Sequence, residues 1–180
     1  MLASLRFEQG PRKVSSLRGE VVVASNRAAA GIYEDETGPV IVEFLTELGF
    51  VVDAPLVVPD GEPVGEAIAA AITGGARVVL TTGGTGLTPT DRTPEMTRPL
   101  LDFEVPGIAD AIRTYGVTHG IPTAVLSRGL AGVAGSCLVV NLPGSKGGVK
   151  DGLAVLRPIL VHAVEQIAGG DHRRSVGSDH

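Results

Sequence analysis

Several residue types are scarce in this chain of 180 residues. It has one cysteine and no tryptophan, and aromatic residues make up only 3% of it. Because hydrophobic residues still account for 43%, the core must be built from valine, leucine, isoleucine and alanine, which suits a parallel sheet covered by helices. The lone Cys137 lies in an apolar run, where a free thiol usually behaves as a small buried hydrophobe.

The chain also lacks the features of a nucleic-acid or membrane protein. Its formal net charge is −5 and its basic residues form no dense stripe, so we expect no nucleic-acid partner. No apolar stretch approaches the roughly 18 residues of a membrane span, and no apolar segment follows a basic N-terminal region. We therefore expect no membrane partner and a location in the reducing cytoplasm.

What is present is an alternation of apolar strands and amphipathic helices. The patterns predict strands at residues 20–25, 50–58 and 77–82, and helices at residues 37–48 and 64–72. This order predicts right-handed crossovers and a sheet that is mainly parallel. Further along, we expect a helix at 107–115, strands at 123–127 and 136–141, and a helix at 148–167 that Pro158 kinks or breaks.

Apolar residues at the two ends of the chain do not recur with a sustained period. We expect residues 1–18 to form an N-terminal extension, residues 19–168 to form one domain, and residues 169–180 to form a flexible C-terminal tail.

The most informative segment is the glycine-rich run at residues 81–95. Gly83, Gly84 and Gly86 allow backbone N–H groups to turn inward without Cβ obstruction and to form a nest for phosphate oxygens. The run follows a predicted strand, and ligands of open α/β sheets bind at the carboxyl ends of strands. A tight turn without a ligand is the alternative interpretation.

Spacing excludes two familiar phosphate loops. The order of Gly144-Ser145-Lys146-Gly147 does not fit the Walker pattern, and Pro89 follows too soon after Gly84-Thr85-Gly86 for a dinucleotide fingerprint. The chain is therefore predicted to be neither a P-loop NTPase nor a nicotinamide dehydrogenase.

Two aspartates follow neighbouring strands. Asp91 lies next to the predicted nest and Asp60 follows the strand at residues 50–58. A carboxylate beside a phosphate site is unfavourable unless a cation bridges the two, and Mg²⁺ prefers one or two carboxylates plus substrate phosphates. We therefore expect Asp60 and Asp91 to hold Mg²⁺, although Asp60 alone is more often a turn residue.

Residues 81–95 resemble the signature of the MogA/MoaB family of molybdenum-cofactor biosynthesis, which includes molybdopterin adenylyltransferases and is similar to the G domain of gephyrin-type proteins. The resemblance spans residues 19–167, and the run after Gly144 is more similar to the MoaB side. Shorter matching blocks are Ser25-Asn26-Arg27, residues 33–39, Val58-Pro59-Asp60, Leu126-Ser127-Arg128 and Asn141-Leu142-Pro143-Gly144. Asn26 departs from the aspartate that many members carry there.

The resemblance implies a three-layer α/β/α fold and the Mg-ATP-dependent adenylylation of molybdopterin, with pyrophosphate as second product. It makes Asp60 and Asp91 the catalytic, metal-associated aspartates. The candidate substrate-binding residues are Asp35, Thr37, Gly38, Thr82, Gly83, Gly84, Thr85, Gly86, Thr93, Glu95, Ser127, Pro143, Gly144 and Ser145. Helix capping is the structural alternative for Asp35, Thr37, Thr93 and Glu95.

The expected partners are molybdopterin, ATP and further copies of this chain, because the resemblance also implies a homotrimer or hexamer. Two other functions stay open: a paralogue that binds molybdopterin or a protein without adenylyl transfer, and an oligomer-forming structural domain with a vestigial site. Retention of both Asp60 and Asp91 favours the enzyme.

Overall fold

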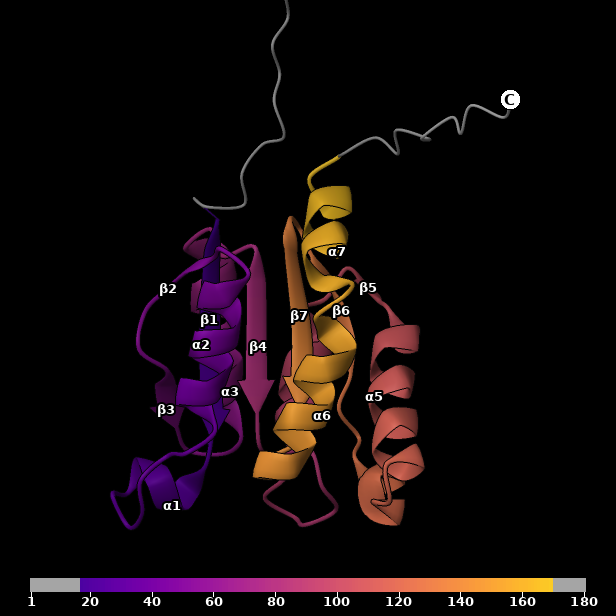
Figure 1. Ribbon diagram of the computed structural model, residues 1–180. Coiled ribbons are helices and arrows are strands. Elements are labelled where there is room, and N and C mark those ends of the chain that lie inside the picture. The colour runs from indigo at the N-terminus through magenta and orange to yellow at the C-terminus, as the bar shows by residue number, and fades with distance from the viewer. Residues whose placement is uncertain (1–16, 170–180) are drawn as a thin grey trace, which may run out of the picture.

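A mainly parallel sheet forms the middle of the fold (Figure 1). The computed structural model describes residues 17–169. Within them, seven strands join the sheet in the order β2-β1-β4-β7-β6-β5, and β3 pairs with β1. Their bounds are β1 Arg18–Ala24, β2 Val51–Val52, β3 Leu56–Val58, β4 Val78–Thr82, β5 Phe103–Glu104, β6 Ala131–Ala134 and β7 Cys137–Leu142.

The direction of the strands confirms the predicted sheet. Strand β1 runs parallel to β2, β3 and β4, and β4 runs parallel to β7. Strands β6 and β5 complete the sheet in antiparallel pairings. The central strands β4 and β7 are buried along their whole length, which explains their continuous apolar runs in the sequence.

Helices cover both faces of this sheet. Val78 and Leu80 of β4 pack in one core with α2, α5, α6 and α7, whereas Val79 packs in a second core with α3. Figure 1 shows α2, α6 and α7 in front of the sheet and α3 behind it. The helices and 3-10 turns are α1 Asn26–Ala29, α2 Gly38–Glu47, α3 Glu62–Thr73, α4 Thr93–Thr97, η1 Arg98–Leu100, α5 Pro106–Thr118, η2 Pro122–Leu126, α6 Lys146–Leu156 and α7 Leu160–Ile167.

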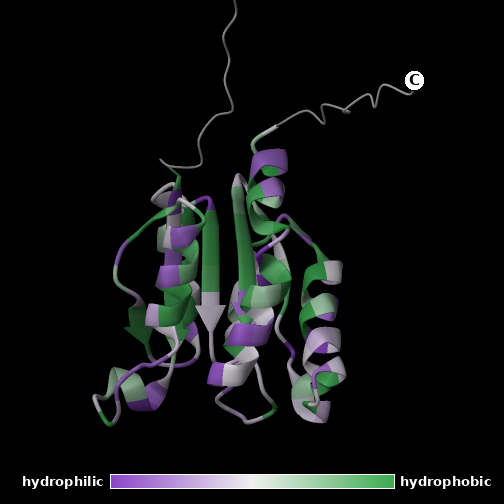
Figure 2. Cartoon of the chain, in the orientation of Figure 1, coloured by the Kyte–Doolittle hydropathy of each residue, from purple (hydrophilic) through white to green (hydrophobic). Residues whose placement is uncertain are grey.

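The hydropathy pattern matches the three layers. In Figure 2, β4 and β7 are mostly hydrophobic along their length, while the helices in front of them carry hydrophilic stretches on the side toward the viewer. The three-layer α/β/α architecture is therefore as predicted. No helix within residues 17–169 is long and apolar enough to cross a membrane.

Two local predictions are confirmed. The helix expected at residues 148–167 breaks around Pro158, with α6 ending at Leu156 and α7 beginning at Leu160, because proline removes a helical hydrogen bond and clashes with the preceding turn. Cys137 is buried with 1% of its surface exposed, and burial raises the pKa of its thiol to about 12. It is a packed core residue.

Three strand predictions need correction. The strand expected at residues 50–58 is split into β2 and β3, since Pro55 cannot donate to a ladder. Residues 123–127 were expected to be a strand, but they lie largely in the 3-10 turn η2, which begins at Pro122. Strands β5 and β6 were not predicted, because β5 has only two residues and β6 consists mainly of alanine and glycine, which carry little strand signal of their own.

Most of both predicted extensions falls outside the described residues. Residues 1–16 and 170–180 are not described, so the division at residues 18 and 169 stays a prediction.

Candidate active site

The carboxyl ends of four parallel strands meet at one edge of the sheet. Figure 1 shows this as the lower edge, where the arrow of β4 ends beside the first turns of α6 and α1 lies at the lower left. The segments that leave these strand ends are Ser25-Asn26 after β1, Pro59-Asp60 after β3, residues 83–92 after β4 and Pro143-Gly144-Ser145 after β7. Most of the predicted site residues lie in these four segments.

The loop after β4 begins with a turn that only glycine fits. Gly83 and Gly84 have φ values of 89° and 65°, which side chains rarely adopt. A Cβ on Gly83 would lie 2.3 Å from the carbonyl oxygen of Ala24, and one on Gly84 would lie 2.3 Å from Thr93 Oγ1. A Cβ on Gly144 would approach Gly83 Cα to 3.1 Å. The ends of β1, β4 and β7 thus converge closely at this turn.

This turn leaves a row of donors available. Within residues 17–169, the N–H groups of Gly84, Thr85 and Gly86 have no hydrogen-bond acceptor. Successive free N–H groups in a turn with left-handed residues form an anion-binding concavity. The predicted nest is therefore present in the backbone.

Asp91 lies at one end of the nest. Its Oδ2 atom accepts hydrogen bonds from Thr88 N at 3.0 Å and from Thr88 Oγ1 at 2.7 Å. The same oxygen would be 2.7 Å from a Cβ on Gly86. Thr88 thus fixes the carboxylate against the nest by one oxygen and leaves the other, Oδ1, without a protein donor among the described residues.

Asp60 lies behind the nest and is fixed by Asn26. Asp60 Oδ2 accepts from Asn26 N at 3.2 Å, and Asp60 N donates to Asn26 Oδ1 at 3.0 Å. Asp60 Oδ1 is 3.0 Å from the position of a Cβ on Gly84. Burial raises the pKa of Asp60 above its ordinary value, the hydrogen bond from Asn26 opposes this, and the charge of Asp91 adds to the rise.

Both carboxylates approach the glycine turn, Asp60 Oδ1 at 3.0 Å from a Cβ on Gly84 and Asp91 Oδ2 at 2.7 Å from a Cβ on Gly86. No group of three or more histidine, cysteine, aspartate or glutamate side chains within residues 17–169 could hold a metal ion. The arrangement fits Mg²⁺, which commonly takes one or two carboxylates and completes its octahedron with water and substrate phosphates. It does not fit a metal that needs a full set of protein ligands.

Arg128 holds the whole loop and was not among the predicted site residues. Its N–H donates to Thr85 O at 2.8 Å, its Nε to Gly86 O at 2.8 Å and its Nη2 to Asp91 O at 2.6 Å. Its Nη1 forms an ion pair with Glu95, and this hydrogen bond is the main reason that the pKa of Glu95 is lowered. The sequence did show the block that contains Arg128, but no local pattern links it to a loop some forty residues earlier.

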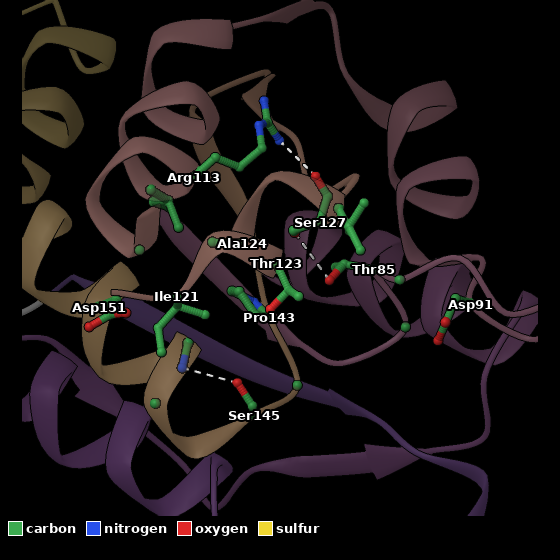
Figure 3. Close-up of a pocket in the computed structure, with 18 residues that line it drawn as sticks. Thr85, Asp91, Arg113, Ile121, Thr123, Ala124, Ser127, Pro143, Ser145 and Asp151 are labelled. Carbon is green, nitrogen blue, oxygen red and sulfur yellow. Dashed lines mark hydrogen bonds between the residues drawn. The ribbon is translucent and has the colours of Figure 1, made fainter. Parts of the chain in front are cut away.

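Two cavities adjoin the turn. The larger has a volume of about 400 Å³ and the smaller about 180 Å³, and Gly144 lines both. Figure 3 shows the larger cavity, with Asp91 at one end and Asp151 of α6 at the other. The site therefore has two hollows next to one glycine turn.

The predicted residues divide between the two cavities. Those that line the larger are Gly84, Thr85, Gly86, Asp91, Ser127, Pro143, Gly144 and Ser145. Those that line the smaller are Asp35, Thr37, Thr82, Gly83 and Gly144. Asp60, Gly38, Thr93 and Glu95 line neither.

Local contacts explain several of these positions. Asp35 Oδ1 accepts from Thr37 N and Thr37 Oγ1, both at 2.9 Å, and its carboxylate also accepts from Gly38 N. It therefore caps the start of α2. Thr93 is fully buried and donates from Oγ1 to Gly83 O at 2.9 Å, so it helps to hold the glycine turn in place. That these residues contact substrate stays a prediction.

Several residues that line the larger cavity were not predicted from the sequence. They come from α5, η2 and α6 and include Ile112, Gly116, Ile121, Ala124 and Asp151. Apart from the aspartate these residues are apolar or glycine, and they have no periodic signal different from that of core residues.

Residues 20–162 match a family model described as a probable molybdopterin binding domain. The chain belongs to this family. The match confirms the resemblance between residues 81–95 and the signature of the MogA/MoaB family.

Individual relatives agree with the family. The chain is 41% identical over 154 residues to a molybdenum cofactor biosynthesis bifunctional protein of Synechococcus elongatus, with 84% of this chain and 48% of that protein covered, so it spans about half of that relative's length. It is 36% identical to a molybdopterin adenylyltransferase of Pyrococcus furiosus, with 81% and 88% covered. A solved structure of the Mog protein of molybdopterin biosynthesis from Mycobacterium ulcerans is 52% identical and superimposes with a TM-score of 0.80, covering 84% of this chain and 99% of that one.

Proposed function

We propose that this protein is a molybdopterin adenylyltransferase of molybdenum-cofactor biosynthesis. In this reaction an oxygen of the terminal phosphate of molybdopterin forms a bond to the α-phosphorus of ATP. The bond from that phosphorus to the bridging oxygen breaks, and pyrophosphate leaves with the electron pair. The name of the Pyrococcus furiosus relative, of which this chain covers 88%, supports the proposal.

The observation that carries the proposal is the row of free N–H groups at residues 84–86 in the wall of the larger cavity, directly after Gly83, which lines the smaller one. The reaction brings two phosphate-bearing molecules into contact, and their mutual repulsion opposes this. Preorganised donors at the meeting point offset that repulsion and keep the reacting groups in place.

The two aspartates complete the site by holding Mg²⁺. When bound, Mg²⁺ neutralises phosphate charge and favours departure of pyrophosphate. Asp91 Oδ1 and the half-buried Asp60 are the groups that would hold it. Thr88 and Asn26 orient the two carboxylates through the hydrogen bonds described above.

The remaining contacts position the loop. Arg128 fixes the carbonyl groups of Gly86 and Asp91, and Ser127 Oγ lies 3.3 Å from Thr85 Oγ1 within the cavity wall. The attacking phosphate monoester, with a second pKa of about 6, is mostly ionised at neutral pH. The reaction therefore needs no general base. The protein has to orient the two substrates and neutralise the negative charge of their phosphates.

The test is incubation of the protein with molybdopterin, ATP and Mg²⁺, with detection of adenylylated molybdopterin and pyrophosphate. We expect both products in equal amounts, and none without Mg²⁺. The matched control is Asp53→Asn, which changes an exposed carboxylate outside both cavities and should leave product formation unchanged.

Binding of molybdopterin without formation of either product would contradict the proposal. It would instead indicate the alternative function, a molybdopterin-binding paralogue without adenylyl transfer.

A further inference from the structure

The wall of the smaller cavity contains a cation that has no role in the proposed reaction. Among the described residues that line this cavity, Lys146 is the only basic one. It is the first residue of α6 and follows Ser145, whose side chain caps that helix by accepting from Gly148 N at 3.1 Å. The cap fixes the backbone at Lys146, while 62% of the surface of its side chain is exposed.

Lys146 forms an ion pair with Glu36, which lines the same cavity. The distance from Lys146 Nζ to Glu36 Oε1 is 2.7 Å, and the side chain of Glu36 is 63% exposed. An ion pair as exposed as this one is weak, because water screens both charges and two long side chains must be ordered to form it. Lys146 can therefore exchange Glu36 for a more highly charged anion at little cost in free energy.

The second carboxylate in the wall of this cavity is already compensated. Asp35 accepts hydrogen bonds from Thr37 N, Thr37 Oγ1 and Gly38 N at the start of α2, where a negative charge also interacts favourably with the helix dipole. Glu36 is balanced by Lys146. An anion that enters the smaller cavity therefore meets one cation whose present partner it can replace.

The size of the smaller cavity suits a pair of phosphates better than a whole nucleotide. Its volume is about 180 Å³, whereas sites that enclose a drug-sized molecule have roughly 300–1,000 Å³. Gly144 lines both cavities, and its N–H has no acceptor within residues 17–169. A phosphate chain held at the glycine turn can therefore continue past Gly144 toward Lys146.

We propose that Lys146 leaves Glu36 and binds the β- and γ-phosphates of the nucleotide, so that the smaller cavity holds the pyrophosphate end. This inference rests on the proposed function. In adenylyl transfer the bond from the α-phosphorus to the bridging oxygen breaks, and its electron pair goes to pyrophosphate. An ammonium group at that end offsets the developing charge. Lys146 is thus the residue that selects a nucleoside triphosphate over a monophosphate.

The test compares three probes: Mg-ATP, Mg-pyrophosphate and AMP, which lacks the two outer phosphates. Calorimetry measures the binding of each to the full chain, to Lys146→Gln, to Lys146→Arg and to the control Lys150→Gln. Lys150 lies one turn further along α6 and lines neither of the two cavities. The control therefore removes the same charge from the same helix without changing the cavity wall.

The expected loss is confined to the probes that carry the outer phosphates. We expect Lys146→Gln to bind ATP and pyrophosphate about 10-fold more weakly or worse, because a hydrogen bond between charged groups is lost. Its affinity for AMP should be unchanged, whereas a disturbed fold would weaken the binding of AMP as well. Lys146→Arg keeps the charge and should recover most of the affinity for ATP, and Lys150→Gln should behave as the unmodified protein.

The variant Glu36→Gln tests the exchange of partners. It leaves Lys146 without its ion pair, so ATP should bind about 2-fold to 5-fold more tightly, in line with the small free energy of an exposed pair. This gain should disappear in the double variant with Lys146→Gln, because no cation remains to be released. A gain that persists in the double variant would mean that Glu36 only repels the phosphates, and the exchange would be wrong.

Three further outcomes would overturn the inference: equal losses for ATP and AMP in Lys146→Gln, unchanged affinity of that variant for ATP and pyrophosphate, or no binding of ATP by the unmodified protein. The adenylylation assay separates these failures from failure of the proposed function. If product forms while Lys146→Gln binds ATP normally, only the role of Lys146 is wrong. If the affinity for ATP falls as expected but no product forms, the proposed function is wrong and the contact of Lys146 with the phosphates is retained.

Discussion

At the scale of single residues, Asn26 explains how a departure from the family pattern is accommodated. Its side-chain oxygen accepts from Asp60 N, and its own N–H donates to Asp60 Oδ2. An aspartate at position 26 could accept the same bond but would add a second negative charge beside Asp60. Asparagine therefore keeps the positioning contact without further raising the pKa of Asp60.

We predict that Asp91→Asn folds normally and loses turnover by about 100-fold or more. The two side chains are nearly isosteric, but the amide removes a ligand charge that Mg²⁺ needs. Adenylyl transfer at saturating substrate gives the turnover, and thermal unfolding gives the stability. Turnover equal to that of Asp53→Asn under limiting Mg²⁺ would remove Asp91 from the mechanism.

A second prediction at this scale concerns the glycine turn. Gly84→Ala should abolish binding of the phosphate-bearing ligand, because the added methyl group collides with Thr93 Oγ1 and approaches Asp60. The matched control is Gly75→Ala, which has a similar φ of 86° but no atom within 4 Å of the new Cβ. Both variants carry the left-handed strain of about 1–2 kcal/mol, and only Gly84→Ala should lose binding in calorimetry. Equal affinities would contradict the nest.

At the scale of elements, the loop after β4 is held by contacts from two other parts of the chain. Arg128 holds its carbonyl groups from the segment that follows η2. Below it, Asn141 of β7 donates to Thr81 Oγ1 and Thr97 Oγ1, both at 3.0 Å, which ties β4, β7 and α4 together. Buried and charged contacts from distant segments thus hold the loop after β4 in place.

We predict that Arg128→Lys preserves the fold but lowers kcat by about 10-fold or more. Lysine keeps the positive charge but cannot donate to Gly86, Asp91 and Glu95 at once, since it lacks the planar fork of donors. Steady-state kinetics and the melting temperature are the measurements. If kcat is unchanged, backbone turns alone hold the loop, and Arg128 has no positioning role.

The buried hydrogen bonds of Asn141 should contribute to the stability of the fold. We expect Asn141→Ala to lower the free energy of unfolding by about 1–3 kcal/mol, because it leaves the buried hydroxyl groups of Thr81 and Thr97 with fewer partners. Denaturant unfolding measures this loss. The triple variant in which both threonines are also valine should recover part of it, and a double-mutant cycle that shows simple additivity would refute the coupling.

At the scale of the whole molecule, the exposed apolar residues point to self-association. Val117, Ile121 and Val125 are 39%, 50% and 60% exposed around the end of α5 and η2, and exposed apolar surface can serve as an interface. We predict a homotrimer or hexamer in light scattering of the full chain. A monomer at micromolar concentration would contradict this prediction, whereas a hexamer that becomes a trimer without residues 1–17 would show that this segment joins two trimers.

Part of the fold and of the candidate site could be predicted from local sequence patterns, and part could not. The glycine-rich run, both aspartates and the alternation of β and α elements could be predicted from the sequence, because left-handed glycines, carboxylates after strands and apolar periodicity are local properties. The family match confirms the resemblance that this run carried. Strands β5 and β6 could not be predicted, since their pairing energy comes from neighbours in the sheet and not from their own residues.

By itself, the sequence determined the glycine turn, the carboxylates after β3 and β4 and the mainly parallel sheet. Only the tertiary structure decided that Arg128 donates hydrogen bonds to the loop, that Thr93 is buried and that Asp151 lines the larger cavity. The physical reason is that backbone conformation and strand formation depend on nearby residues, whereas a cavity wall or a clasp exists only after segments distant in the chain have packed against each other.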